Sequence, residues 1–247
     1  MQSYFFFSDV HLGAPHCPNE AIRKQQLLDF FGFVERHAAG LFIVGDLFDF
    51  WFEYRHAVPR KHFDVLTSLY NLCQSGLEID YVAGNHDMWM GDFLSKEIGL
   101  RVHHRGITRK LHGLQCFITH GDGAARRDSG YRLMKKFLKS PINIFLYRLV
   151  PPDIGFPLAL KVSQTSRTHK VCDSSWDEEY LDFARQRFAE GCDVVMMGHT
   201  HRPRVATVGD NTFVNLGDWI THFTYCELNE AGPQLKIWPT QNNVNGL

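Results

Sequence analysis

Six short polar signatures occur in order along the sequence of 247 residues, and their residue types suit the binding of metal ions. The signatures are Asp9-Val-His11, Gly45-Asp46, Gly84-Asn85-His86-Asp87, His120-Gly-Asp122, Gly198-His199-Thr-His201 and Asn215-Leu-Gly-Asp218. They offer carboxylate, imidazole and amide ligands for two hard or borderline ions. The candidate ligands are Asp9, His11, Asp46, Asn85, His120, His199 and His201.

The spacing of these ligands also favours metal binding. Asp9 and His11 stand two residues apart at the predicted end of a strand, so their side chains leave the same face and can hold one ion. Asp46 has two carboxylate oxygens and can bridge two ions, which a neutral histidine cannot do. Oxygen and nitrogen ligands without thiolate are typical of Mn²⁺, Mg²⁺, Fe or Zn²⁺ centres. We expect two divalent ions, with Mn²⁺ first among these four.

Each signature taken singly has a plainer interpretation. A pair such as Asp9 and His11 commonly lies on a surface or in a satisfied core position, and a Gly-Asp step is commonly a turn. Six signatures in order, each after an apolar run, favour one functional site over coincidence.

The apolar runs before the signatures are short and rich in β-branched and aromatic residues, which predicts buried strands. These runs cover residues 4–7, 41–44, 79–83, 116–119 and 194–197. Amphipathic patterns over 20–37, 60–72 and 176–188 predict helices between them. Strand–helix alternation favours a sheet with helices outside, where functional residues collect at the carboxyl ends of the strands.

Two further regions predict consecutive antiparallel strands. One contains residues 101–104, 107–111 and 114–119, and the other contains 205–208, 212–216, 223–228 and 234–238. We therefore expect an α/β fold with two packed sheets and helices on both outer faces. A single domain over residues 1–247 accommodates these elements.

Residues 128–170 fit neither pattern. Apolar side chains such as Phe137 and Phe145 occur here together with Lys135, Lys136 and Lys139. This composition predicts a helical cap, inserted between two ligand-bearing strands, whose lysines would hold it against an anionic membrane surface. The plainer alternative is a helical hairpin that covers the edge of a sheet.

The overall composition argues against several classes of function. The net charge of −1 gives no general attraction to nucleic acid, so we expect no nucleic-acid partner. Six cysteines without C-x-x-C spacing indicate reduced thiols in a cytosolic protein. The N-terminus has no signal-peptide pattern, and no apolar stretch reaches about 18 residues. We therefore expect a cytoplasmic protein that does not span a membrane.

The motifs S-D-V-H-L-G, G-D-L-F-D-F-W, G-N-H-D, H-G-D and G-H-T-H-R-P, spread over residues 8–218, resemble the calcineurin-like metallophosphoesterase superfamily. The resemblance implies a four-layer αββα sandwich that carries the cap as an insertion. It implies that one ion is held by Asp9, His11, Asp46 and His201. It implies that the other ion is held by Asp46, Asn85, His120 and His199.

The resemblance also implies a catalytic role for His86, which would protonate the leaving oxygen or stabilise the transition state. Two metal ions of this kind clamp a phosphoryl group and activate a water for in-line attack. We expect Asp87 to orient the His86 imidazole and to raise its pKa. Asp49 is either a similar orienting carboxylate or the cap of a helix.

The order H-G-D, D-S-G-Y-R, helical cap and S-x-x-x-R-x-x-K is similar to the UDP-2,3-diacylglucosamine diphosphatases of lipid A synthesis, which release UMP and 2,3-diacylglucosamine 1-phosphate. Two acyl chains need an apolar groove, which Phe137, Ile142, Ile144, Phe145, Leu146, Phe156 and Leu158 would line. Arg167 and Lys170 are candidates for phosphate binding, and Asp128 and Ser163 for bonds to sugar or uridine hydroxyls. This substrate implies peripheral contact with the inner face of the cytoplasmic membrane.

One position departs from that family. Its best-known branch has G-N-R-D, whereas this sequence has G-N-H-D with His86 in place of the arginine. Two hypotheses remain open: a lipid pyrophosphatase, and a phosphodiesterase or phosphatase whose cap selects another small nucleotide or phosphoester. A third, a non-catalytic scaffold on the same fold, is disfavoured because all seven candidate ligands and His86 are present.

Overall fold

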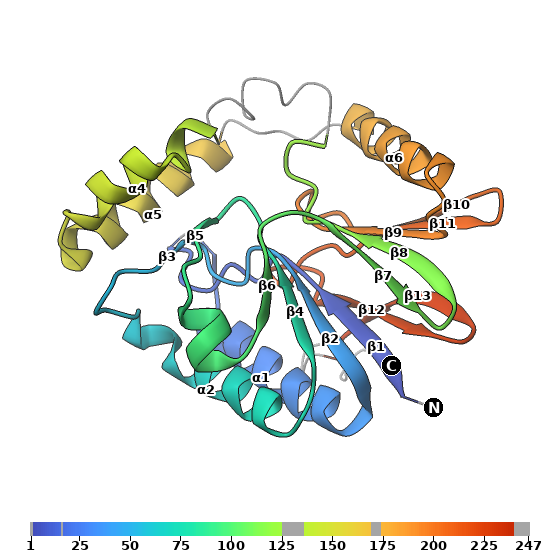
Figure 1. The fold of residues 1–247 in the computed structure, drawn as a ribbon, viewed down its shortest axis with the longest axis horizontal. Coiled ribbons are helices and arrows are strands. Elements are labelled where there is room, and N and C mark those ends of the chain that lie inside the picture. Colours follow the sequence, from blue (N-terminus) through green and yellow to red (C-terminus); the bar gives the residue numbers. More distant parts are fainter. Residues whose placement is uncertain (1, 16, 125–135, 169–173, 240–247) are drawn as a thin grey trace.

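The computed structural model describes residues 2–15, 17–124, 136–168 and 174–239, which form two mixed β-sheets packed face to face between helices (Figure 1). The strand order is β13-β12-β1-β2-β4-β6 in the larger sheet and β10-β11-β9-β8-β7 in the smaller one. Helices cover the outer face of each sheet, so the expected α/β sandwich is confirmed.

The elements of the sandwich agree closely with the predicted ranges. The six-stranded sheet contains β1 (Ser3–Phe7), β2 (Ala38–Val44), β4 (Ile79–Val82), β6 (Arg101–His103), β12 (Thr224–Asn229) and β13 (Gly232–Ile237). The five-stranded sheet contains β7 (Ile107–Leu111), β8 (Leu114–Ile118), β9 (Val194–Met197), β10 (Arg204–Val208) and β11 (Asn211–Asn215). The outer helices are α1 (Glu20–His37), α2 (Phe63–Gln74) and α6 (Ser174–Ala189), and a 3₁₀ turn, η1 (Arg60–His62), precedes α2.

Apolar side chains fill three spaces, and these spaces separate the four layers. Side chains of α1 and α2 pack on the six-stranded sheet, and those of α6 pack on the five-stranded sheet. A third cluster, which includes Phe6 and Phe42, lies between the sheets. Strand β1 serves two of these spaces, since Phe5 and Phe7 face the helices while Phe6 faces the other sheet.

The two predicted antiparallel regions are confirmed only in part: the pairs β7–β8, β10–β11 and β12–β13 are antiparallel, but each region is divided between the two sheets. β6 pairs in parallel with β4 in the larger sheet, whereas β7 pairs with β8 in the smaller one. Likewise β11 pairs with β9, and β12 pairs with β1. The chain crosses from one sheet to the other at Arg105-Gly106, which has the composition of a turn, and again between β11 and β12.

A buried carboxylate links edge strands of both sheets. Asp80 on β4 accepts hydrogen bonds from Nε2 of His103 on β6, at 2.6 Å, and from Nη2 of Arg109 on β7, at 3.1 Å. Arg101 on β6 pairs with the same carboxylate. These contacts join β6 and β7, which are edge strands of different sheets.

Three short elements lie within or after the second and third polar signatures along the chain. Strands β3 (Trp51–Phe52) and β5 (Asp87–Trp89) pair in parallel, and a π-helix, η2 (Phe93–Ile98), comes after them. Two or three residues are too few to show an alternating pattern, so the sequence analysis did not predict β3 or β5.

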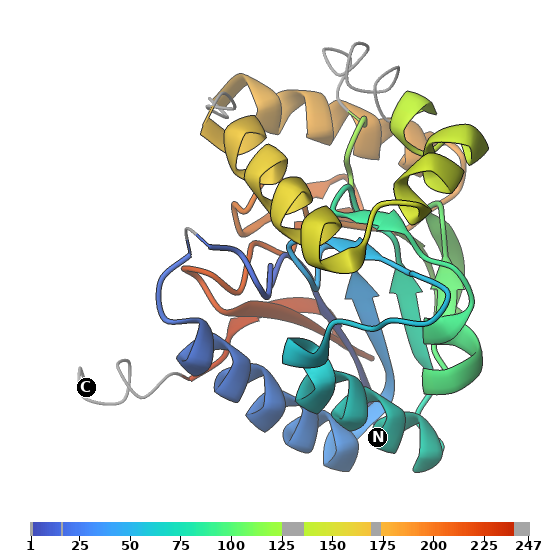
Figure 2. The ribbon, with the colours of Figure 1, turned by 90° about the vertical axis from the view of Figure 1, so that its left-hand side faces the viewer.

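Two helices lie within the range expected for the cap, namely α4 (Pro141–Arg148) and α5 (Pro152–Thr168). We refer to them as the helical hairpin. Helix α4 begins with Ser140, whose side chain accepts a hydrogen bond from the Asn143 amide, and with Pro141 in its first turn. Figure 1 shows the hairpin at the end of the molecule near β3 and β5, opposite α6, and Figure 2 shows this end from the front. Among the described residues, no helix combines the length and apolarity that crossing a membrane requires.

We predict that Phe42→Ala destabilises the protein by about 3–5 kcal/mol, because the substitution leaves a cavity between the sheets. The Phe42 ring is buried and stacks on Phe6 with ring centroids 4.5 Å apart. Urea denaturation followed by circular dichroism measures the change. Phe63→Ala is the control, because this exposed ring should contribute less than about 0.5 kcal/mol. Equal losses in the two variants would contradict the assigned packing.

Candidate metal centre

The candidate ligands follow the carboxyl ends of five strands, β1, β2, β4, β8 and β9. Five of them have left-handed backbone conformations: Asp9 (φ 55°), His11 (φ 49°), Asp46 (φ 55°), His199 (φ 71°) and His201 (φ 58°). Aspartate and histidine tolerate this region better than most residues, yet it remains strained. Such strain at adjacent strand ends is typical of functional sites.

Two glycines of the signatures are required by close packing. A side chain at Gly45, which itself has a φ of +82°, would collide with the ring of His120. A side chain at Gly84 would collide with the carboxylate of Asp46. The glycines therefore let the ligand-bearing loops approach one another.

Asp9, His11 and His201 form the first group of ligand atoms. The Nε2 atoms of His11 and His201 face each other at 3.3 Å. Oδ1 of Asp9 lies 3.4 Å from the first of these nitrogens and 3.3 Å from the second. This buried oxygen has no hydrogen-bond partner within the described structure. One carboxylate oxygen and two imidazole nitrogens thus converge on a point that suits a divalent cation.

Asp46, Asn85 and His120 form the second group. Nε2 of His120 lies 3.2 Å from Oδ2 of Asp46 and 3.1 Å from Oδ1 of Asn85. The ring of His199 lies beside that of His120, with ring centroids 5.1 Å apart. The structure therefore brings together all seven residues that the sequence analysis proposed as ligands.

One oxygen of Asp46 lies between the two groups. Oδ2 is 3.8 Å from Nε2 of His11 and 3.2 Å from Nε2 of His120. Oδ1 instead accepts a hydrogen bond from the backbone amide of His86, at 2.9 Å. Oδ2 is therefore the Asp46 oxygen that faces histidine nitrogens of both groups.

A backbone contact fixes the orientation of His120. Its Nδ1 lies 2.8 Å from the carbonyl oxygen of Val44, which can only accept, so Nδ1 carries the hydrogen. The lone pair of a neutral His120 then lies on Nε2 and points toward Asp46. This is the tautomer that binds a metal ion through Nε2.

The electrostatics of the centre also fit cations. Burial raises the pKa of Asp9 and of Asp46, but the neighbouring histidines outweigh burial and hold both values well below the usual range. Burial lowers the pKa of His120, but Asp46 and then Asp9 outweigh it and raise the value to about 10. The metal-free protein thus keeps two buried carboxylates ionised and His120 protonated. Metal binding must displace that proton.

His86 lies at the edge of the centre and is oriented by Asp49. Its Nδ1 donates to the backbone carbonyl of Asp49 at 2.6 Å and lies 3.6 Å from the carboxylate of the same residue. Its Nε2 faces Oδ2 of Asp46 at 4.0 Å. Asp49 precedes strand β3 and does not begin a helix, so the alternative of a helix cap is wrong.

The expectation that Asp87 orients His86 is corrected. The Asp87 carboxylate turns inward and accepts hydrogen bonds from the amides of Gly84 and Asp46 and from the hydroxyl of Tyr81. Burial and then Asp46 raise the pKa of this carboxyl group. Asp87 therefore fixes the loops that carry Asp46 and Asn85. Tyr81 was not predicted as part of the site, and its place inside strand β4 gave no signal.

The sixth signature, which contains Asn215 and Asp218, contacts the loop that carries His199 and His201. The Asn215 side chain donates to the Gly198 carbonyl at 3.2 Å and to the Thr200 hydroxyl at 2.8 Å. Asp218 lies 3.9 Å from Nδ1 of His201 and 2.9 Å from Nδ1 of His222. These contacts hold the loop that carries His199 and His201.

The proposed substrate-binding residues have not been located. Asp128 and Lys170 lie outside the described residues, and so does Lys135. Ser163 and Arg167 belong to α5, but their side chains lie outside the described structure.

Ile144 and Phe156 were expected to line an apolar groove, and Lys139 was expected to face an anionic membrane surface. Ile144 is buried, and Phe156 packs against Phe50 with ring centroids 5.7 Å apart. Lys139 donates to the backbone carbonyls of Gly84 and Asp87, so it does not serve as a surface lysine. Lys136, by contrast, is exposed.

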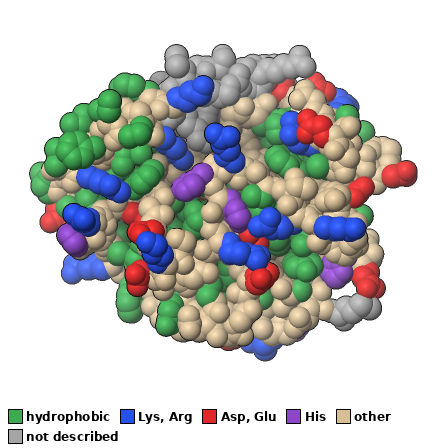
Figure 3. All heavy atoms as spheres, in the orientation of Figure 1, with side chains coloured by type: hydrophobic (Ala, Val, Ile, Leu, Met, Phe, Trp, Pro, Cys, Tyr) green, Lys and Arg blue, Asp and Glu red, His purple; other side chains and the backbone are tan. Residues whose placement is uncertain are grey.

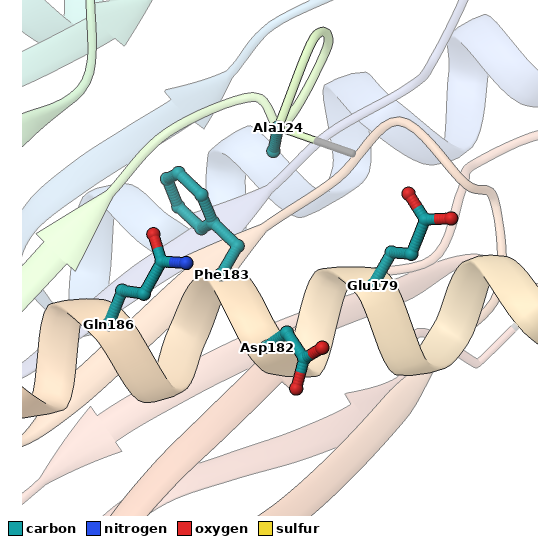
Figure 4. A pocket seen from close by; sticks show the side chains of 5 residues that line it. All are labelled: Ala124, Glu179, Asp182, Phe183 and Gln186. Atoms are coloured by element: carbon teal, nitrogen blue, oxygen red, sulfur yellow. The ribbon is translucent and has the colours of Figure 1, made fainter. Parts of the chain in front are cut away.

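A separate hollow lies between α6 and the loop after His120 (Figure 4). Its lining residues are Ala124, Glu179, Asp182, Phe183 and Gln186. Two of these described residues are acidic and none is basic, so the hollow does not suit a phosphate group.

Comparisons with known proteins decide the family. A family model described as calcineurin-like phosphoesterase matches residues 3–203. The chain belongs to this family. It is therefore a metal-dependent hydrolase, and the two ligand groups described above correspond to a family that uses a dimetal centre.

Curated relatives include the UDP-2,3-diacylglucosamine hydrolase of Porphyromonas gingivalis, which is 31% identical over 240 residues, 90% of this chain and 92% of the relative. The protein of the same name from Vibrio parahaemolyticus is 26% identical over 95% of this chain and 97% of the relative. Among solved structures, an Escherichia coli phosphoesterase gives a TM-score of 0.49 at 17% identity, covering 97% of this chain and 95% of that one.

We predict that Asp46→Ala removes bound metal and lowers hydrolysis of bis(p-nitrophenyl) phosphate at least about 100-fold, because Oδ2 of Asp46 serves both ligand groups. Elemental mass spectrometry after dialysis measures the metal, and release of p-nitrophenol measures the activity. Asp92→Ala removes an exposed carboxylate that pairs with Lys96 and should leave both quantities unchanged. Full metal content in Asp46→Ala would contradict the shared-oxygen arrangement.

Proposed function

We propose that this metallophosphoesterase hydrolyses UDP-2,3-diacylglucosamine at its pyrophosphate linkage and releases UMP and 2,3-diacylglucosamine 1-phosphate. The names of the curated relatives support this substrate. The observation that carries the proposal is the exposed apolar surface of the helical hairpin, whose opposite contacts are with the loops that carry Asp46 and His86.

That surface is concentrated in a short part of the chain. Among the described residues, more than half of the exposed large hydrophobic side chains lie between positions 137 and 158. They are Phe137, Leu138, Ile142, Phe145, Leu146, Leu149, Ile154 and Leu158. Figure 3 shows hydrophobic side chains gathered over α4 and α5. A large exposed apolar patch favours contact with lipid or with an apolar ligand.

The same surface supports a proposed peripheral contact with the inner face of the cytoplasmic membrane. Lys136, Arg148 and Lys161 are exposed among these apolar residues. Basic side chains interspersed with apolar ones favour an anionic membrane surface. Such a contact would bring the metal centre to a substrate whose acyl chains reside in the bilayer.

The residues of the centre divide the chemical work. When bound, the two ions supply Lewis acidity toward the phosphoryl group and an activated water, and we propose Mn²⁺ as the ion. Asp9, His11, Asp46 and His201 would hold one ion. Asp46, Asn85, His120 and His199 would hold the other. Nδ1 of His86 donates to the Asp49 carbonyl, so the imidazolium form would carry its second proton on Nε2 and would donate it to the leaving oxygen.

The remaining substrate contacts are proposed from the sequence. Arg167 and Lys170 would bind phosphate oxygens, and Asp128 and Ser163 would bind hydroxyls of the sugar or uridine. Ser163 and Arg167 belong to α5, Lys170 follows α5 in the sequence, and Asp128 precedes the helical hairpin.

A second candidate function is hydrolysis of another small nucleotide or phosphodiester. The observation that favours it is His86, which stands where the best-known diphosphatase branch has an arginine. A substrate with less negative charge near this position would need no cation there.

Purified protein supplied with Mn²⁺ should release UMP from UDP-2,3-diacylglucosamine in mixed micelles, as measured by anion-exchange chromatography. Bis(p-nitrophenyl) phosphate is assayed alongside, and Asp46→Ala controls for contaminating hydrolases. Activity on the small diester alone would refute the lipid substrate and favour the second candidate. Flotation with vesicles that contain anionic phospholipid tests the membrane contact.

We predict that His86→Ala lowers kcat by about 100-fold or more while metal content stays near normal, because we propose this imidazole as a proton donor and not as a ligand of either ion. His56→Ala removes an exposed histidine and should leave kcat unchanged. Full activity in His86→Ala would refute the catalytic role. Loss of both metals would instead assign His86 to the structure of the centre.

A further inference from the structure

The helical hairpin contacts two loops of the metal centre, the one that follows Asp46 and the one that follows His86. The ring of Tyr147 lies 4.5 Å from that of Phe52, measured between centroids, and the ring of Phe156 lies 5.7 Å from that of Phe50. Both partners follow Asp46 in the chain. The guanidinium of Arg148 lies over the ring of Trp89, which follows His86, at 5.4 Å.

Lys139, immediately before the hairpin, makes the contact nearest to the centre. Its ammonium donates to the carbonyl oxygen of Asp87 at 2.7 Å and approaches that of Gly84 at 3.5 Å. These two carbonyls lie on either side of Asn85 and His86. The Lys139 side chain therefore binds both ends of the turn that carries the proposed ligand Asn85 and the proposed proton donor His86.

The buried carboxylate of Asp87 holds the same turn through backbone amides. The carboxylate of Asp87 accepts from the Gly84 amide at 2.8 Å and from the Asp46 amide at 3.1 Å. A buried anion thus fixes the amides of the turn, and the Lys139 cation fixes its carbonyls. Displacing a catalytic group by about 1 Å can cost about 100-fold in rate, so such clamps matter for His86.

We propose that Lys139 is a positioning residue, which acts through the Gly84–Asp87 turn to hold Asn85 and His86 in their working positions. The packing of the hairpin segment against the turn then determines the position of the His86 imidazole. This inference rests on the proposed role of His86 and not on the lipid substrate.

The test compares Lys139→Met, Lys139→Arg and Lys110→Met with the parent protein on bis(p-nitrophenyl) phosphate, a small diester that needs no acyl groove. Lys139→Met should lower kcat about tenfold or more and change KM less than about twofold. Metal content and melting temperature should stay at the parent values. Lys139→Arg should recover most of the rate, because the guanidinium also donates to carbonyls. Lys110→Met, at an exposed lysine of strand β7, should match the parent.

A double variant links the effect to His86. If Lys139 acts through this imidazole, adding Lys139→Met to His86→Ala should change kcat less than about twofold. An unchanged kcat in Lys139→Met overturns the proposal, and so does a rise in KM alone, which would make Lys139 a substrate contact. A full further loss in the double variant, or loss of metal in Lys139→Met, assigns Lys139 a general structural role instead. Failure on UDP-2,3-diacylglucosamine with these results intact would refute only the proposed substrate.

Discussion

Oδ2 of Asp46 lies within 4.0 Å of imidazole nitrogens from His11, His86 and His120, which come from three different loops. One buried negative charge therefore draws together the ends of β1, β2, β4 and β8. Burial alone would favour the neutral carboxylic acid, but the histidines keep the pKa of Asp46 low. The positions of these three imidazoles depend on this anion, because its Oδ2 atom faces a nitrogen of each of them.

The ligands also support one another through their backbones. The amide of His199 donates to Oδ2 of Asp9 at 2.8 Å, and the amide of His86 donates to Oδ1 of Asp46. In each case the side chain of one ligand holds the backbone next to another. Left-handed conformations at Asp9, Asp46 and His199 are maintained by such mutual contacts. The geometry of the centre therefore depends on contacts between the loops and not on any single loop.

The strands of the two sheets, and the convergence of the candidate ligands at their ends, could be predicted because each signature follows an apolar run. Sheet membership could not, since Arg105-Gly106 has the composition of a turn whether the next strand stays in the sheet or leaves it. The direction of the Asp87 side chain could not be predicted either, because its partners are backbone amides, which every residue except proline has. Lys139 was misplaced for the same reason: its partners are backbone carbonyls far away in the chain.

The Asp80 cluster has a consequence for how separate molecules meet. β6 and β7 are edge strands, and an exposed edge can pair with a strand of another chain. Asp80 keeps Arg101 on the first edge and Arg109 on the second, each partly exposed. A strand added at either edge would have to strip water from these cations. The carboxylate that joins the two sheets therefore also protects both edges from aggregation.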